Sequence, residues 1–299
     1  MENEPETYSD KLLSFTLPIR NARGRVVRLD ASLNDILSAH RYPPPITHLL
    51  SEALVLTALM GGLLKAKGDD AQLTMQAQTN DGVVSLLVCD FRGGSMRGYA
   101  EFDAERLEGL GANPNLRAFF GQGYLTITFE TGAGQRYQGI VPLEGDTLAE
   151  ACEAYFSQSE QVPTLVRIAS SSNADKCSAA GLLIQHLADG EEGRERLHVR
   201  MDHPDWQHVK TICSTLSHDE LLDPTLTMEA IIWRLFHEEN EIRIQVGEAL
   251  ERGCRCSAAH YISVLNRFPR EERQSMQNED GLVVVDCAFC SKTYELTLG

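Results

Sequence analysis

The chain has 299 residues, of which 42% are hydrophobic, and a formal net charge of −16. This length allows one large domain or two to three smaller ones, and the hydrophobic content is sufficient for a buried core. The acidic charge argues against nucleic acid as a partner, because binding to a phosphate backbone requires a basic surface. The most apolar stretch, residues 49–64, contains Glu52 and is too short to span a membrane, and the polar start of the chain has no signal-peptide pattern.

Residues 1–190 are predicted to form an N-terminal α/β core domain with antiparallel strands, so that the fold class of the whole chain is α+β. Turn sequences typical of hairpins lie at 80–82 and at 131–134. Three prolines at 43–45 precede a long helix with an apolar face. The predicted elements are strands at 15–17, 26–29, 73–78, 83–88, 96–102, 124–129, 135–141 and 165–170, and helices at 32–39, 46–65 and 148–157.

Residues 191–245 are predicted to form a helical linker. Two segments carry apolar residues with helical spacing, and either Asp223 or Thr227 could cap the second. Such helices need a partner surface, so we expect them to dock on the first domain, on the C-terminal module or on both. Their apolar faces favour burial in a core, with a reversible docking surface as the alternative, and Trp206 and Trp233 are both expected to report undocking. The candidate client or docking face consists of Met228, Ile231, Ile232, Leu235 and Phe236.

Residues 246–299 contain the most specific pattern of the chain. Cys254 and Cys256 form a C-x-C pair, which is followed after 30 residues by a C-x-x-C pair at Cys287 and Cys290. Two close cysteine pairs separated by a long loop are typical of a metal site. Four thiolates match the tetrahedral preference of Zn²⁺ and leave no position for a catalytic water. We therefore predict a small C-terminal zinc-binding module, with the C-x-x-C pair in a hairpin and one Zn²⁺ per chain.

The four sulfur atoms are also groups that oxidants attack, because a thiolate is both a metal ligand and a nucleophile. A disulfide within C-x-C would close a very small ring, and strained disulfides are readily reduced again. Loss of the metal is expected to unfold the module. The cysteine pattern alone leaves three interpretations open: an inert zinc ribbon, a switch that couples oxidation to unfolding, and a thioredoxin-like thiol–disulfide enzyme.

No catalytic residue is predicted elsewhere. The sequence has no P-loop, nucleophile-elbow or zinc-protease motif, and His203, His208 and His218 lack ligand spacing. Cysteines beside a metal motif, in a chain without an export signal, indicate the reducing cytoplasm. The remaining four cysteines are scattered and are expected to act as small buried hydrophobic residues: Cys89, Cys152, Cys177 and Cys213.

The order of core domain, helical linker and cysteine module resembles the bacterial redox-regulated 33 kDa chaperonin family, the oxidation-activated holdases. The resemblance covers nearly the whole chain, and the spacing of the two cysteine pairs is its most specific part. The other segments that carry it are Gly123-Tyr124, Arg136-Tyr137-Gln138-Gly139, residues 143–148, residues 155–164 and residues 233–239.

The resemblance implies a chaperone without enzymatic activity that is inactive when reduced and zinc-bound. Oxidation would join Cys254 to Cys256 and Cys287 to Cys290, release the zinc and destabilise the helical linker. The active form would be a dimer that holds unfolded or oxidatively damaged proteins without ATP, and neither nucleic acid nor a membrane would be a partner. The alternative is a constitutive zinc-ribbon adaptor or scaffold without a redox response.

Overall fold

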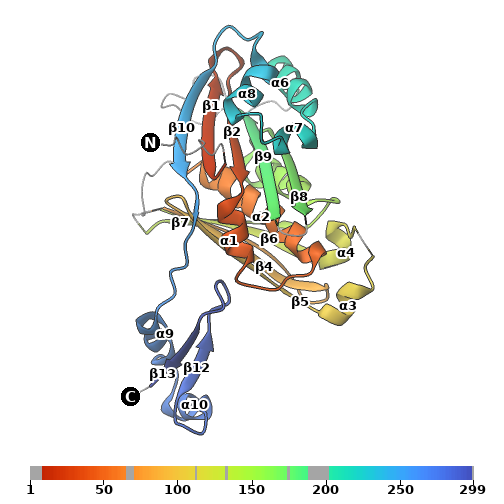
Figure 1. Cartoon of the computed structure of the whole chain (residues 1–299). Coiled ribbons are helices and arrows are strands. Elements are labelled where there is room, and N and C mark those ends of the chain that lie inside the picture. The colour runs from red at the N-terminus through yellow and green to blue at the C-terminus, as the bar shows by residue number, and fades with distance from the viewer. Residues whose placement is uncertain are drawn as a thin grey trace, which may run out of the picture.

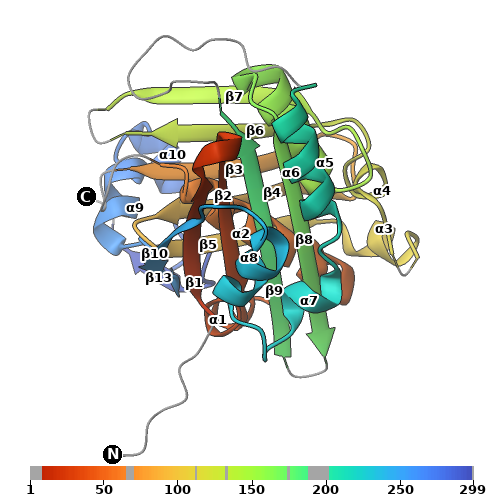
Figure 2. The same cartoon turned by 90° about the horizontal axis from the view of Figure 1, so that it is seen from above.

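Two β-sheets pack on opposite sides of a central helix, α2 (Pro44–Gly61), and a smaller module lies at one end of the molecule (Figure 1). The structure is a computed structural model and describes residues 9–64, 71–111, 113–131, 134–173, 176–187 and 202–297. The strands of the two sheets run across one another, as Figure 2 shows. Mixed helices and antiparallel sheets confirm the predicted α+β class.

The five-stranded sheet has the strand order β10-β1-β2-β9-β8, and the six-stranded sheet has the order β11-β5-β4-β3-β6-β7. Neighbouring strands are antiparallel, with one parallel pair between β11 and β5. The predicted hairpins are confirmed as β3–β4 and β6–β7. The strands of the two sheets are β1 (Lys11–Leu17), β2 (Ala22–Leu29), β3 (Gln72–Thr79), β4 (Val84–Arg92), β5 (Ser95–Phe102), β6 (Gly123–Glu130), β7 (Arg136–Pro142), β8 (Thr164–Asn173), β9 (Lys176–His186), β10 (Arg243–Ala249) and β11 (Glu251–Arg252).

Helix α2 is buried on nearly every side because both sheets cover it, with contacts to strands of each. It ends at Gly61, four residues before the predicted end, where the ring of Phe91 leaves no space for a side chain. The predicted helix at 148–157 ends at Tyr155 and continues as a π-helical turn. The remaining helices of this body are η1 (Pro18–Arg20), α1 (Ala31–Leu37), α3 (Ala104–Glu108), α4 (Leu116–Phe120), α5 (Leu148–Tyr155) and η2 (Phe156–Glu160).

The linker helices dock on the five-stranded sheet. They are α6 (Pro204–Ser214), α7 (His218–Leu222) and α8 (Met228–Phe236), and the N-cap of α8 is Thr227, one of the two predicted caps. The rings of Phe15 and Phe236 lie 5.7 Å apart within a second hydrophobic core. Trp206 is 3% exposed, but Trp233 is 62% exposed. The expectation that both tryptophans report undocking is therefore wrong for Trp233, because an already hydrated indole changes little.

A cluster of charged side chains fixes both ends of this helical segment to the body. Arg20 binds Asp205 of α6 at 2.7 Å and Glu239, just after α8, at 3.0 Å. His208 of α6 lies 2.9 Å from the same Glu239. The Glu239 carboxylate is 8% exposed, so partial desolvation strengthens these pairs relative to surface ion pairs.

Strand β10 connects the linker helices to the C-terminal module, which holds α9 (Ala258–Leu265), α10 (Arg270–Ser275), β12 (Val283–Asp286) and β13 (Thr293–Leu296). In Figure 1 the helices α6–α8 and this module lie at opposite ends of the molecule. The predicted boundary at 245/246 falls inside β10, and the boundary at 190/191 lies outside the described residues. The division into three domains stays a prediction. No helix within the described ranges is long and apolar enough to cross a membrane.

Candidate metal centre

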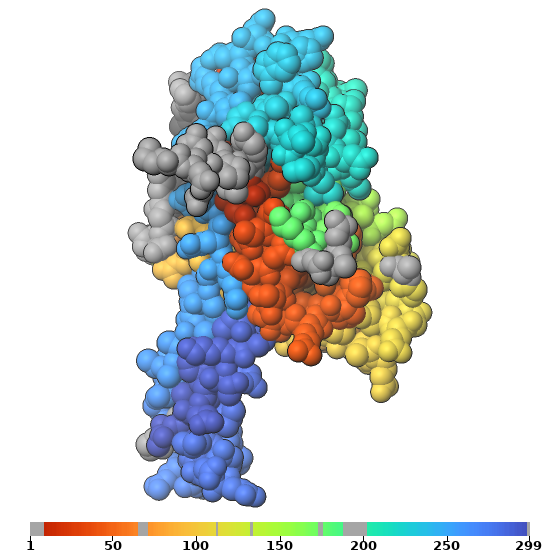
Figure 3. Space-filling model, viewed as in Figure 1, coloured from red at the N-terminus to blue at the C-terminus, as the bar shows by residue number. Residues whose placement is uncertain are grey.

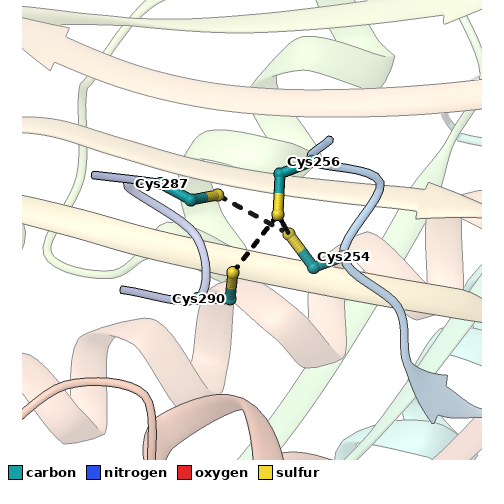
Figure 4. A group of neighbouring side chains, drawn as sticks. All are labelled: Cys254, Cys256, Cys287 and Cys290. Atoms are coloured by element: carbon teal, nitrogen blue, oxygen red, sulfur yellow. Dashed lines mark hydrogen bonds between the residues drawn. The ribbon is translucent and has the colours of Figure 1, made fainter. Parts of the chain in front are cut away.

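The four cysteines of the predicted metal site come from two loops of the C-terminal module. Cys254 and Cys256 lie in the irregular segment between β11 and α9. Cys287 and Cys290 enclose the turn between β12 and β13. In that turn the N–H groups of Cys290 and Ser291 donate to the carbonyl of Cys287, at 3.2 and 2.8 Å, and Ser291 adopts a left-handed φ of 56°. The tight turn brings both sulfur atoms to the side that faces the other pair (Figure 4).

The four sulfur atoms converge on one point, with all of them within 4.8 Å of one another. The Sγ atom of Cys254 lies 3.3 Å from that of Cys256 and 3.6 Å from that of Cys287, and Cys256 lies 3.5 Å from Cys290. A tetrahedral ion with metal–sulfur bonds of about 2.3 Å separates its ligands by about 3.8 Å, so the arrangement has the dimensions of a Cys₄ site. All four are free thiols. They are positioned to bind a metal ion.

The electrostatics of this group of thiols favours a bound cation. Burial opposes ionisation of Cys287, but hydrogen bonds from the Tyr261 hydroxyl and from the N–H groups of Phe289 and Cys290 outweigh it and lower the pKa of Cys287 to about 6. Burial and the neighbouring sulfur atoms raise the pKa of Cys290 to about 12, and burial also raises the pKa of Cys254. Ionisation of one thiol therefore opposes ionisation of its neighbours. Four thiolates are stable together only around a bound cation.

Two tyrosines that the sequence did not reveal complete the surroundings of the sulfur atoms. Tyr294 on β13 donates to the carbonyl of Cys256 at 3.2 Å, and its hydroxyl lies 3.2 Å from the sulfur of the same residue. The ring of Tyr261 on α9 lies 5.3 Å from that of Tyr294. Hydrogen-bond partners of metal ligands orient those ligands, and these contacts can orient the cysteine sulfurs in the same way. No local motif marks them, because they meet the cysteines only in the folded module.

The predicted docking face lies away from the metal centre. Met228, Ile231, Ile232 and Phe236 are buried, and Leu235 is partly buried, all against the hydrophobic core on the five-stranded sheet. The structure therefore brings the four cysteines together but does not bring this face to them. A role of the face in client binding stays a prediction.

The remaining cysteines differ from one another in burial. Cys89, Cys152 and Cys213 are buried as expected, and burial raises the pKa of each thiol, to about 12 for Cys152 and Cys213. Cys177 is only half-buried, and its sulfur lies 3.4 Å from the hydroxyl of Ser172. The expectation of full burial is wrong for Cys177, which lies near the start of β9 and packs against the edge of the core.

Comparisons with known proteins give the same family throughout. The family model described as Hsp33 protein matches residues 10–297. A 33 kDa chaperonin of Caulobacter vibrioides (strain NA1000 / CB15N) is 38% identical over 303 residues, which cover 98% of this chain and 97% of that protein. A 33 kDa chaperonin of Shigella boydii serotype 4 (strain Sb227) is 36% identical over 286 residues, covering 95% and 91% of the two chains.

The fold has a counterpart among solved structures. The crystal structure of the 33 kDa chaperonin, a heat shock protein 33 homologue, from Thermotoga maritima matches with a TM-score of 0.77 at 20% sequence identity. The match covers 96% of this chain and 95% of that one. At this identity the likeness shows the fold alone, whereas the family model and the relatives span nearly the whole chain at higher identity. Together with the four converging cysteines, they show that the chain belongs to the Hsp33 chaperonin family.

Proposed function

We propose that this protein is a redox-regulated, ATP-independent holdase that is inactive when reduced and zinc-bound. The observation that carries the proposal is the convergence of four thiols in a module with almost no apolar core, where only Val283, Cys287 and Leu296 are buried among residues 254–297. Such a module depends on its metal for folding. The all-sulfur, tetrahedral donor set favours one Zn²⁺ per chain, held by Cys254, Cys256, Cys287 and Cys290.

Oxidation would convert the four ligands into two disulfides, Cys254–Cys256 and Cys287–Cys290. Zinc keeps the sulfurs deprotonated and therefore reactive toward peroxides. In each pair the two thiolates would give two electrons to one peroxide molecule, which takes up two protons from solvent and leaves as two waters. Sulfur distances of 3.3 to 3.6 Å favour no particular pairing. Sequence neighbours are supported because they stay close after the metal leaves, whereas Cys254 and Cys287 are 33 residues apart.

The signal would reach the linker helices through β10. Two strands precede the module in the chain: β10, which pairs with β1, and β11, which pairs with β5. Ile242, just before β10, packs on the same core as α8. Unfolding of the module would remove the anchor of this segment, so that β10 and then α8 lose their support. Undocking would expose the apolar face of α8 and the sheet surface beneath it, including Phe15.

Exposed apolar surface of this kind would bind unfolded or oxidatively damaged proteins and a second copy of the chain, which gives the dimer of the active form. The name shared by the relatives, chaperonin, supports a client-binding role in place of an enzymatic one. A thiol-based switch of this type works where thiols start out reduced, which favours the cytoplasm. Nucleic acid and membranes are not expected partners of this acidic chain.

The test is an aggregation assay on a thermally unfolding client protein, with zinc release followed by a chromogenic chelator. Reduced protein should leave aggregation unchanged, and peroxide-treated protein should suppress it while releasing about one zinc per chain. Equal suppression before and after peroxide would contradict the proposal and favour a constitutive adaptor. Turnover in an insulin-reduction assay would instead indicate a thiol–disulfide enzyme.

A further inference from the structure

The residue enclosed by the C-x-C pair contacts the six-stranded sheet rather than the metal site. Arg255 donates from Nη2 to Oδ2 of Asp90 on β4 at 3.1 Å and to Oε1 of Gln72 on β3 at 3.3 Å. The Asp90 carboxylate is 4% exposed, and it also accepts a hydrogen bond of 2.7 Å from Thr74. A buried carboxylate that binds a guanidinium gives a charge-assisted hydrogen bond, which is stronger than a neutral one.

The C-x-x-C pair places an aromatic ring on the same part of the sheet. The guanidinium of Arg97 on β5 lies 3.9 Å above the centroid of the Phe289 ring, and the ring of Tyr99 meets it edge-on at 4.8 Å. Arg97 also binds Asp90 at 2.6 Å, so both contacts share one network. We call Arg255 and Phe289, together with Asp90, Arg97 and Tyr99, the module–sheet contact.

Each module residue of this contact lies between two cysteines of the proposed metal site. Arg255 lies between Cys254 and Cys256, and Phe289 lies between Cys287 and Cys290. Arg255 lies in an irregular segment and Phe289 in a tight turn, so the relative position of the two loops depends on the common centre of the sulfur atoms. In Figure 3 the module projects from the body of the molecule, with one end against it. Both side chains therefore reach the sheet together only while the sulfurs are held together.

We propose that the module–sheet contact couples metal binding to docking, so that each strengthens the other. This inference rests on the proposed metal site. If the contact forms only in the metal-bound module, its free energy is added to the apparent metal affinity, and reciprocally the metal favours the docked module. Oxidation of either cysteine pair then releases one half of the contact, and the sheet surface around Tyr99 is uncovered before the linker helices move.

The test measures the zinc affinity of the reduced, full-length chain by equilibrium competition with a chromogenic chelator. Arg255→Ala removes both hydrogen bonds from the guanidinium to the sheet, and its zinc affinity should fall about tenfold. Tyr99→Ala changes only the sheet side, far along the chain from the ligands, and its zinc affinity should also fall, by severalfold. Arg270→Ala, an exposed arginine of the same module, is the matched control and should leave zinc affinity unchanged.

The sheet-side variant separates coupling from a local effect on the ligand loop. If Arg255→Ala lowers zinc affinity but Tyr99→Ala does not, the effect is local and the inference is wrong. The inference also fails if both variants bind zinc as tightly as the unaltered chain. Failure of the unaltered chain to bind zinc would instead overturn the proposed metal site. In both variants hydrogen exchange of β4 and β5 should rise at saturating zinc, while the thermal unfolding of the body stays unchanged.

Discussion

The C-terminal module and the body of the molecule are stabilised in different ways. In the body, buried apolar side chains form one continuous cluster around α2 and a second one beneath α6–α8. In the module α9 and α10 bury no residue, and the centre is occupied by four sulfur atoms. The buried apolar clusters can stabilise the body, whereas the proposed metal would stabilise the module. A reagent that acts on sulfur can therefore unfold the module while the two sheets around α2 stay folded.

The largest effect expected from this difference follows removal of the metal. A chelator, or the substitution Cys287→Ser, should unfold the module, because structural zinc contributes about 10–16 kcal/mol in small domains. Hydrogen exchange should rise across 254–297 while β2 and β9 stay protected. Cys177→Ser, which changes a half-buried thiol outside the module, should leave both regions intact. If the module remained protected from hydrogen exchange without metal, it would not depend on a cation for folding, and the proposed difference between the two regions would be wrong.

The reverse experiment weakens the body and leaves the metal site alone. Phe236 is 1% exposed and packs against Phe15, so Phe236→Ala should reduce the free energy of unfolding of the body by about 3–5 kcal/mol. Trp233→Ala on the same helix removes an exposed ring and should change it by less than about 0.5 kcal/mol. Urea unfolding followed by circular dichroism measures both. Because the proposed coupling is reciprocal, Phe236→Ala should also lower zinc affinity, whereas Trp233→Ala should not. Unchanged zinc affinity in Phe236→Ala would show that the two regions are independent.

Local signals in the sequence were sufficient for features that form locally. Ligand spacing identified the cysteines, turn sequences identified the two hairpins, and helical periodicity identified α6 and α8. Strand β9 was missed because its long run of buried residues has no alternation, and β10 was missed because all its residues are exposed. Periodicity carries no information when both faces of a strand have the same environment.

Features that depend on distant contacts left no signal. Arg255 and Asp90 are 165 residues apart, so neither marks the other in the sequence. Trp233 lies on an apolar helix, and only the docked geometry shows that its ring faces solvent. The sequence alone left open whether the linker helices dock on the first domain, on the C-terminal module or on both. The helices dock on the five-stranded sheet because Phe15 and its neighbours supply an apolar surface that the module lacks.

The junction between the two regions offers a smaller perturbation. A Cβ atom on Gly253 would lie 1.5 Å from Oγ and 2.8 Å from Cβ of Ser95, so Gly253→Ala should separate β11 from β5 at a cost of about 1–3 kcal/mol. The amides of Glu251 and Gly253, which donate to the carbonyls of Gly94 and Met96, should then exchange faster. Adding Ser95→Gly removes the clash and should restore protection. Fast exchange that persists in the double variant would assign the effect to backbone strain from Ala at position 253 or to the added flexibility of Gly at position 95 instead.

The smallest and most selective perturbation acts on α8 alone. Thr227 caps this helix, its hydroxyl accepting the N–H of Ala230 at 3.0 Å, so Thr227→Ala should destabilise α8 by about 1 kcal/mol. Thr227→Ser keeps the cap and is the matched control. Because the proposed coupling is reciprocal, zinc affinity should fall at most severalfold in Thr227→Ala and should not change in Thr227→Ser. If undocking of α8 follows unfolding of the module, Thr227→Ala should reach half-maximal holdase activity at a lower peroxide dose than Thr227→Ser, with the same zinc release at each dose. Identical dose curves for client binding would place the client surface elsewhere than on α8 and the sheet beneath it.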